Sequence, residues 1–299
     1  MLKRTITGFF ILLTVVVFLV LKQFSSIYFD ALSLVIMYCA LFETVRVYKV
    51  ANKKIDYAVF LIPITICTIF NLESDTFKSI GYIVLVALVF VLYLLLSEII
   101  SYGMKRKNGT NETNTEVLNQ TLFDKTKYTM MVFAYPVVVL SCLFALNHLG
   151  DKIGYMGLIL SYAISMSTDT FAYLVGKCFG KRKFIPEVSP NKTVAGLVGG
   201  FLGGIIASVI CLLIFINVPY FSTTVKLKQD AFILVFSILG VLSSLADQLG
   251  DLIASALKRK VGVKDYANIF PGHGGFMDRV DGLMFTVASI YIIFALFLV

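Results

Sequence analysis

The sequence is poor in several residue types, and each shortage narrows the class of protein. Tryptophan is absent from the 299 residues, so anchoring at a membrane surface falls to the 15 tyrosines and to lysine and arginine. The 5 cysteines form no C-x-x-C pair, which excludes a disulfide framework or a cysteine metal site and leaves them as small core residues. Charged residues make up only 15% against 58% hydrophobic residues, a composition that excludes a soluble domain.

Long apolar runs occur along the whole chain, and their lengths match the thickness of a bilayer. We therefore expect an all-α fold, a polytopic integral membrane protein with about nine transmembrane helices. The runs span residues 5–21, 29–45, 57–70, 79–102, 129–147, 153–175, 196–218, 231–259 and 282–299. The run 57–70 is the shortest and contains Pro63, so it is the weakest of the nine predictions.

The distribution of the basic residues predicts the orientation in the cell membrane. Of 26 lysines and arginines, only Lys22, Lys78, Lys152, Lys226 and Lys228 fall on one side of the nine-helix topology. The positive-inside rule then places the N-terminus in the cytoplasm and the C-terminus outside. The net charge of +8 is therefore a signal of topology, and its distribution argues against binding to nucleic acid.

A polar stretch at residues 105–127 divides the chain into two parts. Residues 1–128 are expected to form a transmembrane scaffold ending in a polar cytoplasmic linker, and residues 129–299 a transmembrane catalytic domain. The first part carries little chemistry, so its expected roles are scaffold and homodimer surface. Glu43 lies three residues before Arg46, and the spacing favours a local ion pair.

The densest group of charged residues lies near the C-terminal end of the chain. If the run 231–259 is one helix, Asp247, Asp251, Ser255 and Lys258 share one face of it. Asp247 would lie about 24 Å along this helix, close to the boundary between hydrocarbon and headgroups. Two carboxylates, a hydroxyl and an ammonium group would then face the same side.

A second carboxylate pair, Asp278 and Asp281, opens the last apolar run at a spacing that also puts both on one face. A turn rich in proline and glycine precedes it and contains His273, expected to shape the turn or donate a hydrogen bond. Four close carboxylates repel one another unless a cation such as Mg²⁺ holds them. Nearby bases could bind phosphate oxygens: Lys258, Arg259, Lys264 and Arg279.

Acids for a metal and bases for phosphates favour phosphoryl or nucleotidyl transfer. A plainer alternative is a solvated cytoplasmic loop that is basic for reasons of topology, its acids pairing with its bases. That alternative accounts well for Lys260 but does not explain why acids recur on one helix face.

A family resemblance begins at Ser255. From there to Asp281 the residues S-A-L-K-R-K-V-G-V-K-D-Y-A-N-I-F-P-G-H-G-G-F-M-D-R-V-D resemble the signature of the phosphatidate cytidylyltransferases. The resemblance implies conversion of CTP and phosphatidate to CDP-diacylglycerol and pyrophosphate with Mg²⁺, a second cation being left open. The expected metal ligands are Asp251, Asp278, Asp281, Asp247 and Asp169. The expected catalytic residues are Asp251, Asp278, Asp281, Lys258 and His273.

Two stretches outside the signature also resemble the family. Asp169 lies in a D-x-x-A-Y-x-x-G pattern, at a depth similar to that of Asp247, although a lone intramembrane acid can also bond a neighbouring helix. Ser189, Lys192 and Thr193 belong to a Ser-Pro-x-Lys-Thr core. Expected substrate-binding residues are therefore Ser189, Lys192, Thr193, Ser255, Arg259, Lys264 and Arg279.

The chain departs from the family pattern directly after Thr193. Where relatives carry an aromatic residue and a glutamate, this chain has Val194 and Ala195, so an acidic role at that position is in doubt. The glycines that follow, between residues 196 and 204, predict close helix packing. An outer loop is expected after Pro219.

Two other functions remain compatible with an oily cavity that contains acids and bases. A CTP-dependent kinase acting on a polyprenol-type lipid needs the same groups and would release CDP. A cation-coupled transporter would use the buried acids to move ions without CTP. The transporter leaves the long signature unexplained.

Overall fold

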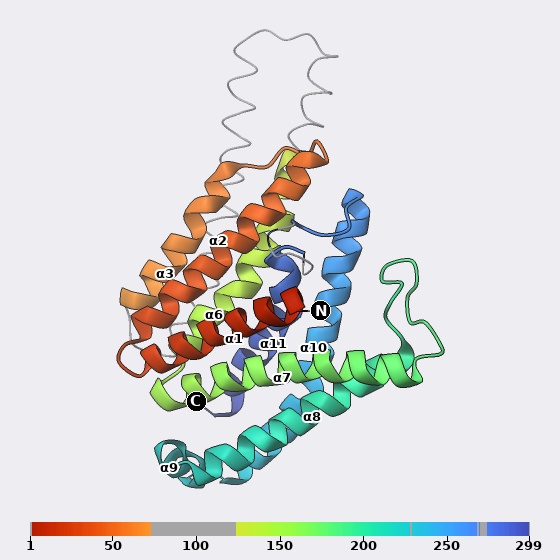
Figure 1. Cartoon of the computed structure of the whole chain (residues 1–299). Coiled ribbons are helices and arrows are strands. Elements are labelled where there is room, and N and C mark those ends of the chain that lie inside the picture. The colour runs from red at the N-terminus through yellow and green to blue at the C-terminus, as the bar shows by residue number, and fades with distance from the viewer. Residues whose placement is uncertain (1, 73–123, 228, 268, 270–273, 299) are drawn as a thin grey trace, which may run out of the picture.

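A computed structural model describes residues 2–72, 124–227, 229–267, 269 and 274–298 (Figure 1). The described residues are helical apart from connecting loops and a single isolated bridge between Lys183 and Thr193. The expected helix at residues 79–102 lies outside the described part of the chain.

The helices of the first part of the chain are α1 (Leu2–Lys22), α2 (Ser26–Val50), the 3-10 helix η1 (Tyr57–Leu61) and α3 (Ile62–Leu72). Those of the second part are the π-helical turn η2 (Phe133–Val138), α6 (Val139–Asn147), α7 (Asp151–Phe179), α8 (Val194–Asn217), α9 (Pro219–Leu227), α10 (Gln229–Val261) and α11 (Met277–Phe297). Within the described residues, 6 helices are long and apolar enough to cross a membrane, and Gly8–Lys22 and Tyr57–Asn71 are shorter apolar helices.

Most expected helices are confirmed, with three differences in detail. The helix around residues 129–147 is interrupted by η2, where Tyr135 has a non-helical backbone next to Pro136. The loop expected after Pro219 is wrong, because Pro219 opens the helix α9, a position that proline tolerates. The last helix begins at Met277, so that Asp278 lies in its first turn.

Helices α7 and α8 lie side by side, and α8 also packs against α10 (Figure 1). Small residues make this close approach possible. A Cβ on Gly203 would lie 2.6 Å from the backbone oxygen of Ser167 on α7, and one on Gly204 would lie 2.5 Å from the Cβ of Ser244 on α10. The glycines of α8 are therefore packing residues on two sides, as their spacing predicts.

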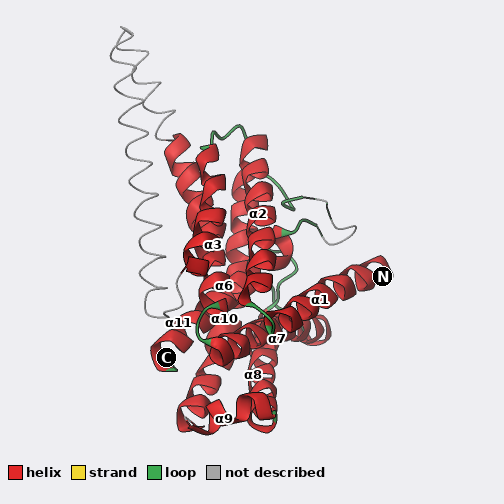
Figure 2. Cartoon of the chain, turned by 90° about the vertical axis from the view of Figure 1, so that its left-hand side faces the viewer, coloured by secondary structure: helices red, strands yellow, loops and turns green. Residues whose placement is uncertain are grey.

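Helix α2 packs against α6 and α11, so the first part of the chain contacts the last helix directly. In Figure 2, α1 leaves this bundle at an angle. Several of its large apolar side chains are exposed, among them Phe9, Phe10 and Val20, as expected for a helix that contacts lipid.

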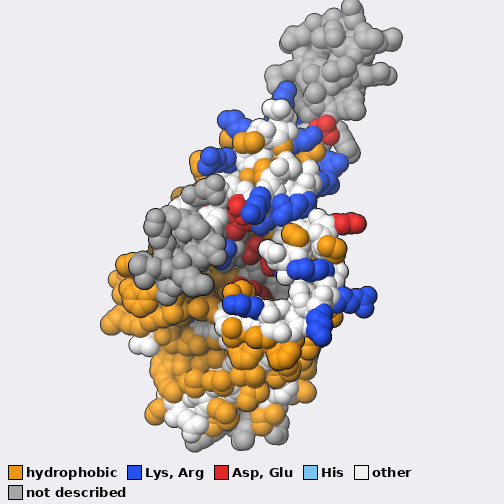
Figure 3. All heavy atoms as spheres, turned by 45° about the vertical axis from the view of Figure 1, so that its right-hand side comes forward, with side chains coloured by type: hydrophobic (Ala, Val, Ile, Leu, Met, Phe, Trp, Pro, Cys, Tyr) orange, Lys and Arg blue, Asp and Glu red, His pale blue; other side chains and the backbone are white. Residues whose placement is uncertain are grey.

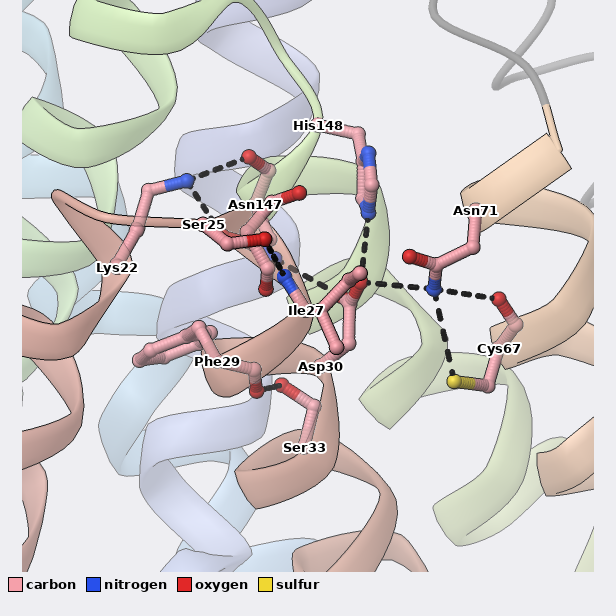
Figure 4. Close-up of polar contacts among 11 residues, drawn as sticks. Lys22, Ser25, Ile27, Phe29, Asp30, Ser33, Cys67, Asn71, Asn147 and His148 are labelled. Atoms are coloured by element: carbon pink, nitrogen blue, oxygen red, sulfur yellow. Dashed lines mark hydrogen bonds and ion pairs between the residues drawn. The ribbon is translucent and has the colours of Figure 1, made fainter.

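A buried carboxylate near the start of α2 joins this helix to its neighbours (Figure 4). Asp30 accepts hydrogen bonds from the side-chain amides of Asn147 at 2.8 Å and Asn71 at 2.9 Å, and His148 Nε2 lies 2.9 Å away. Lys22 of α1 donates to the backbone oxygen of Asn147 at 2.8 Å. The network links α1, α2, α3 and α6, and it gives His148 a structural contact.

The glycine packing predicts a selective loss of stability. Replacing Gly203 by alanine should lower stability by about 1–3 kcal/mol, because the new methyl group overlaps the backbone of α7. Thermal unfolding in detergent, with Cys178→Ser in every variant, can be followed with a thiol-reactive dye that detects exposure of buried thiols such as Cys211. Gly8→Ala is the matched control, since nothing lies within 4 Å of a Cβ there. Equal midpoints for the two variants would contradict tight packing at Gly203.

Candidate functional site

A polar cavity of about 760 Å³ lies where the C-terminal parts of α7 and α10 and the N-terminal parts of α8 and α11 meet the loop of residues 180–193. Its volume is in the range of small-molecule sites. Six of the predicted site residues line it: Asp169, Ser189, Lys192, Thr193, Asp251 and Arg279. Figure 3 shows Lys and Arg side chains around a hollow that contains acidic side chains, above a belt of hydrophobic side chains.

The face predicted on α10 is present, because Gln229–Val261 is one continuous helix. Asp251 points into the cavity and forms an ion pair with Lys192 of the loop, with Nζ and Oδ2 2.8 Å apart. Ser255, one turn further along, donates to Oδ1 of Asp251 at 3.4 Å. The ion pair joins the loop of residues 180–193 to α10 at the cavity.

Thr193 ends the loop and begins α8. Its hydroxyl accepts a hydrogen bond from the backbone N–H of Gly196 at 3.0 Å and so caps the helix. Lys192 also donates to the backbone oxygen of Gln248 on α10 at 3.3 Å. Loop and helices are therefore held together at the cavity wall by Lys192 and Thr193.

Asp247 lies deeper and is almost fully buried. Its Oδ1 accepts hydrogen bonds from Ser165 at 2.6 Å and Thr286 at 3.0 Å, whereas its buried Oδ2 has no partner among the described residues. Gly282 leaves the space for this carboxylate, because a Cβ there would lie 2.8 Å from Oδ1. Asp247 thus carries a buried oxygen that is free to bind a ligand.

The side chain of Asp278 is only 5% exposed, and both of its carboxylate oxygens accept hydrogen bonds. Lys258 lies 2.6 Å from Oδ1, and the backbone N–H groups of Tyr266 and Gly275 donate to Oδ2 at 3.0 Å and 2.9 Å. Asp278 therefore ties α10, the signature loop and the start of α11 together. Burial, with the charges of Asp281 and Asp278 adding to it, raises the pKa of Tyr266, so its phenol stays protonated.

Asp281 lies on α11, three residues after Asp278, and is largely buried. Its Oδ1 accepts a hydrogen bond from the backbone N–H of Gly282 at 2.9 Å. Of the carboxylates predicted from α7, α10 and α11, Asp169 and Asp251 line the polar cavity, whereas Asp281 does not.

Two predicted phosphate-binding residues lie away from the cavity lining. Arg259 is exposed and donates to the backbone oxygens of Val188 at 3.3 Å and Val263 at 3.2 Å. Lys264 lines a separate cavity of about 430 Å³ together with Arg46. His273 lies outside the described residues. The structure therefore does not bring Arg259 and Lys264 into the polar cavity.

The donor set can be compared with the needs of a divalent cation. Among the described residues, no three carboxylate, histidine or cysteine side chains converge into a preformed metal site. The available donors are nevertheless oxygens, which hard cations prefer, and the buried Oδ2 of Asp247 lacks any other partner. The chemical type of these donors therefore suits a hard cation such as Mg²⁺.

Two residues at the site escaped the sequence interpretation. Glu43 was expected to pair with Arg46, but it is buried and binds backbone N–H groups at the start of α11 instead. Gln248 lines the cavity and donates to the backbone oxygen of Leu197 at 3.3 Å. The sequence signal at each position is a polar residue within an apolar run. This signal does not indicate which residue the side chain contacts.

Helices long and apolar enough to cross a membrane surround a cavity of acids and bases, which is typical of a membrane-embedded protein with a site for an anionic ligand. The chain belongs to the cytidylyltransferase family, whose model matches residues 2–297. A phosphatidate cytidylyltransferase of Bacillus subtilis is 32% identical over 298 residues, which cover 99% of this chain and 98% of the relative.

Two further relatives match part of the chain. Phosphatidate cytidylyltransferases of Staphylococcus haemolyticus and Staphylococcus aureus are 35% and 36% identical over 188 and 190 residues. Each of these matches covers 59% of this chain and 65% of the relative.

The ion pair of Lys258 and Asp278 predicts a large effect on stability. Lys258→Met leaves Asp278 buried without its counterion, which typically costs about 3–5 kcal/mol; its two backbone hydrogen bonds favour the lower end of that range. Lys260→Met removes an exposed ammonium two residues away and is the matched control. Thermal unfolding in detergent should separate the two variants clearly. Similar midpoints would show that the ion pair contributes little.

Proposed function

We propose that the chain is a phosphatidate cytidylyltransferase that joins CTP and phosphatidate into CDP-diacylglycerol and releases pyrophosphate. The observation that carries the proposal is the cavity in which Asp251 and Asp169 face Lys192 and Arg279. This combination suits a polyphosphate bound with a metal ion, and the full-length similarity to the Bacillus subtilis enzyme supports it.

The basic residues of the cavity would bind the phosphates of the two substrates. Lys192 and Arg279 line it, as do Lys177 and Lys183, and an arginine can make two parallel bonds to one phosphate. Ser189 and Thr193 supply hydroxyl groups in its lining, and the hydroxyl of Ser255 donates to Asp251 of that lining. Arg259 and Lys264 stay predicted phosphate ligands from outside the cavity wall.

Asp251, Asp278 and Asp281 would hold Mg²⁺, with Asp247 and Asp169 beside them. When bound, the ion would neutralise the triphosphate and polarise its α-phosphate. Lys258 would then share its charge between Asp278 and the substrate. A second monovalent or divalent cation would find further carboxylate oxygens in the same environment.

The reaction balances without an additional base. A phosphate oxygen of phosphatidate attacks the α-phosphorus of CTP, and the bond from that phosphorus to the bridging oxygen of the β-phosphate breaks. Pyrophosphate leaves with the electron pair. Because a phosphate monoester is already ionised near neutral pH, no strong base is needed, and His273 would shape the turn or donate a hydrogen bond.

The proposed topology has nine spans, with the active site facing the cytoplasm. The 6 long helices and two shorter apolar helices would account for eight crossings, and residues 79–102 for one more. Residues 1–128 would serve as scaffold and linker and residues 129–299 as the catalytic part. Membrane lipids would contact α1, and the homodimer surface on the first helices stays a prediction.

The reaction can be tested with purified protein, phosphatidate, Mg²⁺ and CTP labelled at the α-phosphate. We expect label in an organic-soluble liponucleotide. Asp251→Asn should reduce the rate by at least about 10²-fold, because it removes a charge that faces the reacting phosphates. Asp124→Asn, which changes an exposed carboxylate outside the cavity, should leave the rate unchanged.

The alternatives give different results in the same experiment. Transfer of γ-label from CTP to a polyprenol, with no α-label in lipid, would replace the proposal by a lipid kinase. Cation flux into liposomes without CTP, and no labelled lipid, would favour a transporter. Equal activity of Asp251→Asn and wild type would remove Asp251 from the reaction.

The orientation can be tested with a native thiol. Cys178 is exposed at the end of α7 beside the cavity, whereas Cys211 is buried. A membrane-impermeant maleimide should label the protein in inverted vesicles and not in right-side-out vesicles. Cys178→Ser should abolish this labelling. Labelling only in right-side-out vesicles would reverse the proposed topology.

A further inference from the structure

Glu43 of α2 contacts the first turn of α11, although 233 and 234 positions separate it from its partners. Its Oε1 accepts a hydrogen bond from the N–H of Phe276 at 2.7 Å, and its Oε2 accepts one from the N–H of Met277 at 2.8 Å. Only 1% of Glu43 is exposed. A carboxylate so buried makes these bonds without competition from water.

The contact supplies what the start of α11 lacks locally. Phe276 is the N-cap of the helix, and no side chain of its own segment caps it. The first N–H groups of a helix have no partner within the helix, and its N-terminus favours negative charge. Gly275 admits the carboxylate, because a Cβ there would lie 2.5 Å from Oε2 of Glu43.

A second carboxylate, that of Asp278, also contacts the start of α11. Asp278 accepts from the N–H of Gly275 and also contacts Lys258 of α10. The first turn of α11 therefore contacts Glu43 of α2 and, through Asp278, Lys258 of α10. Asp281 follows three residues later on the same helix, so its position depends on that of this turn.

We propose that Glu43 is a positioning residue for the reaction: it fixes the start of α11 so that Asp278 and Asp281 face the acids of α10. The proposal rests on the proposed function for its effect on rate, but the contact itself can be tested without activity. It gives α2 a role in the active site, whereas the sequence assigned α2 to the scaffold.

Glu43→Gln is the direct test, since it keeps the size of the side chain and turns one acceptor into a donor that faces a backbone N–H. Hydrogen–deuterium exchange of the peptide over residues 274–283 should accelerate by about tenfold or more, because a charge-assisted hydrogen bond is lost. Exchange in α8 should stay unchanged. The kcat for cytidylyl transfer should fall about tenfold, with KM for CTP within about twofold of wild type.

Asp124→Asn is the control for loss of one carboxylate charge, and it should alter neither exchange nor kcat. Glu43→Asp keeps the charge on a shorter side chain and should restore part of both, which also provides a readout if Glu43→Gln does not fold. Faster exchange throughout the protein, with kcat unchanged per folded molecule, would show a merely structural role and overturn the proposal. So would unchanged local exchange.

The two proposals fail separately. If wild-type protein transfers no cytidylyl group, the proposed function falls, while local exchange in the variants still reports whether Glu43 holds α11. If wild type is active and Glu43→Gln equals it in rate and exchange, the positioning role falls and the proposed function stands.

Discussion

The structure depends on one physical requirement: each carboxylate buried among apolar helices must have a compensating partner. An isolated ionised carboxylate is costly in a medium that lacks water. The chain meets this requirement differently at each position. Asp247 faces two hydroxyls, Asp278 a lysine and two backbone N–H groups, and Asp30 two amides and a histidine, while the partly exposed Asp251 faces a lysine. Each partner comes from another element, so compensation of charge also determines how the helices are arranged.

Close packing supports the same arrangement. The glycines of α8 allow α7 and α10 to approach from two sides, which brings Asp169 and Asp251 to one cavity. Gly282 does the same on a smaller scale by leaving space for Asp247. Small residues thus act on the site indirectly, because they set the separation of the helices that carry its charges.

The sequence predicted the features that depend on local pattern. The lengths of the apolar runs predicted the helices. Helical periodicity predicted that Asp247, Asp251 and Ser255 lie on one face of α10. Partners distant in the chain could not be predicted in this way. Glu43 seemed paired with Arg46 because spacing reports only neighbours, and Lys264 seemed close to the cavity because it is near Lys258 in sequence. The helix α9 was missed because Pro219 signals the end of one helix and the start of another equally well.

The length of α10 has a consequence for how the lipid is met. With 33 residues, the helix measures about 50 Å, more than the roughly 30 Å of hydrocarbon, so part of it extends beyond the apolar layer. With its apolar part in the hydrocarbon, its charged end would carry Lys258 and Arg259 beyond the acids toward the headgroups. A phospholipid then need not be extracted from its leaflet to react. Turnover would follow the mole fraction of the lipid within the bilayer plane, and dilution with inert lipid would slow it even at constant bulk concentration.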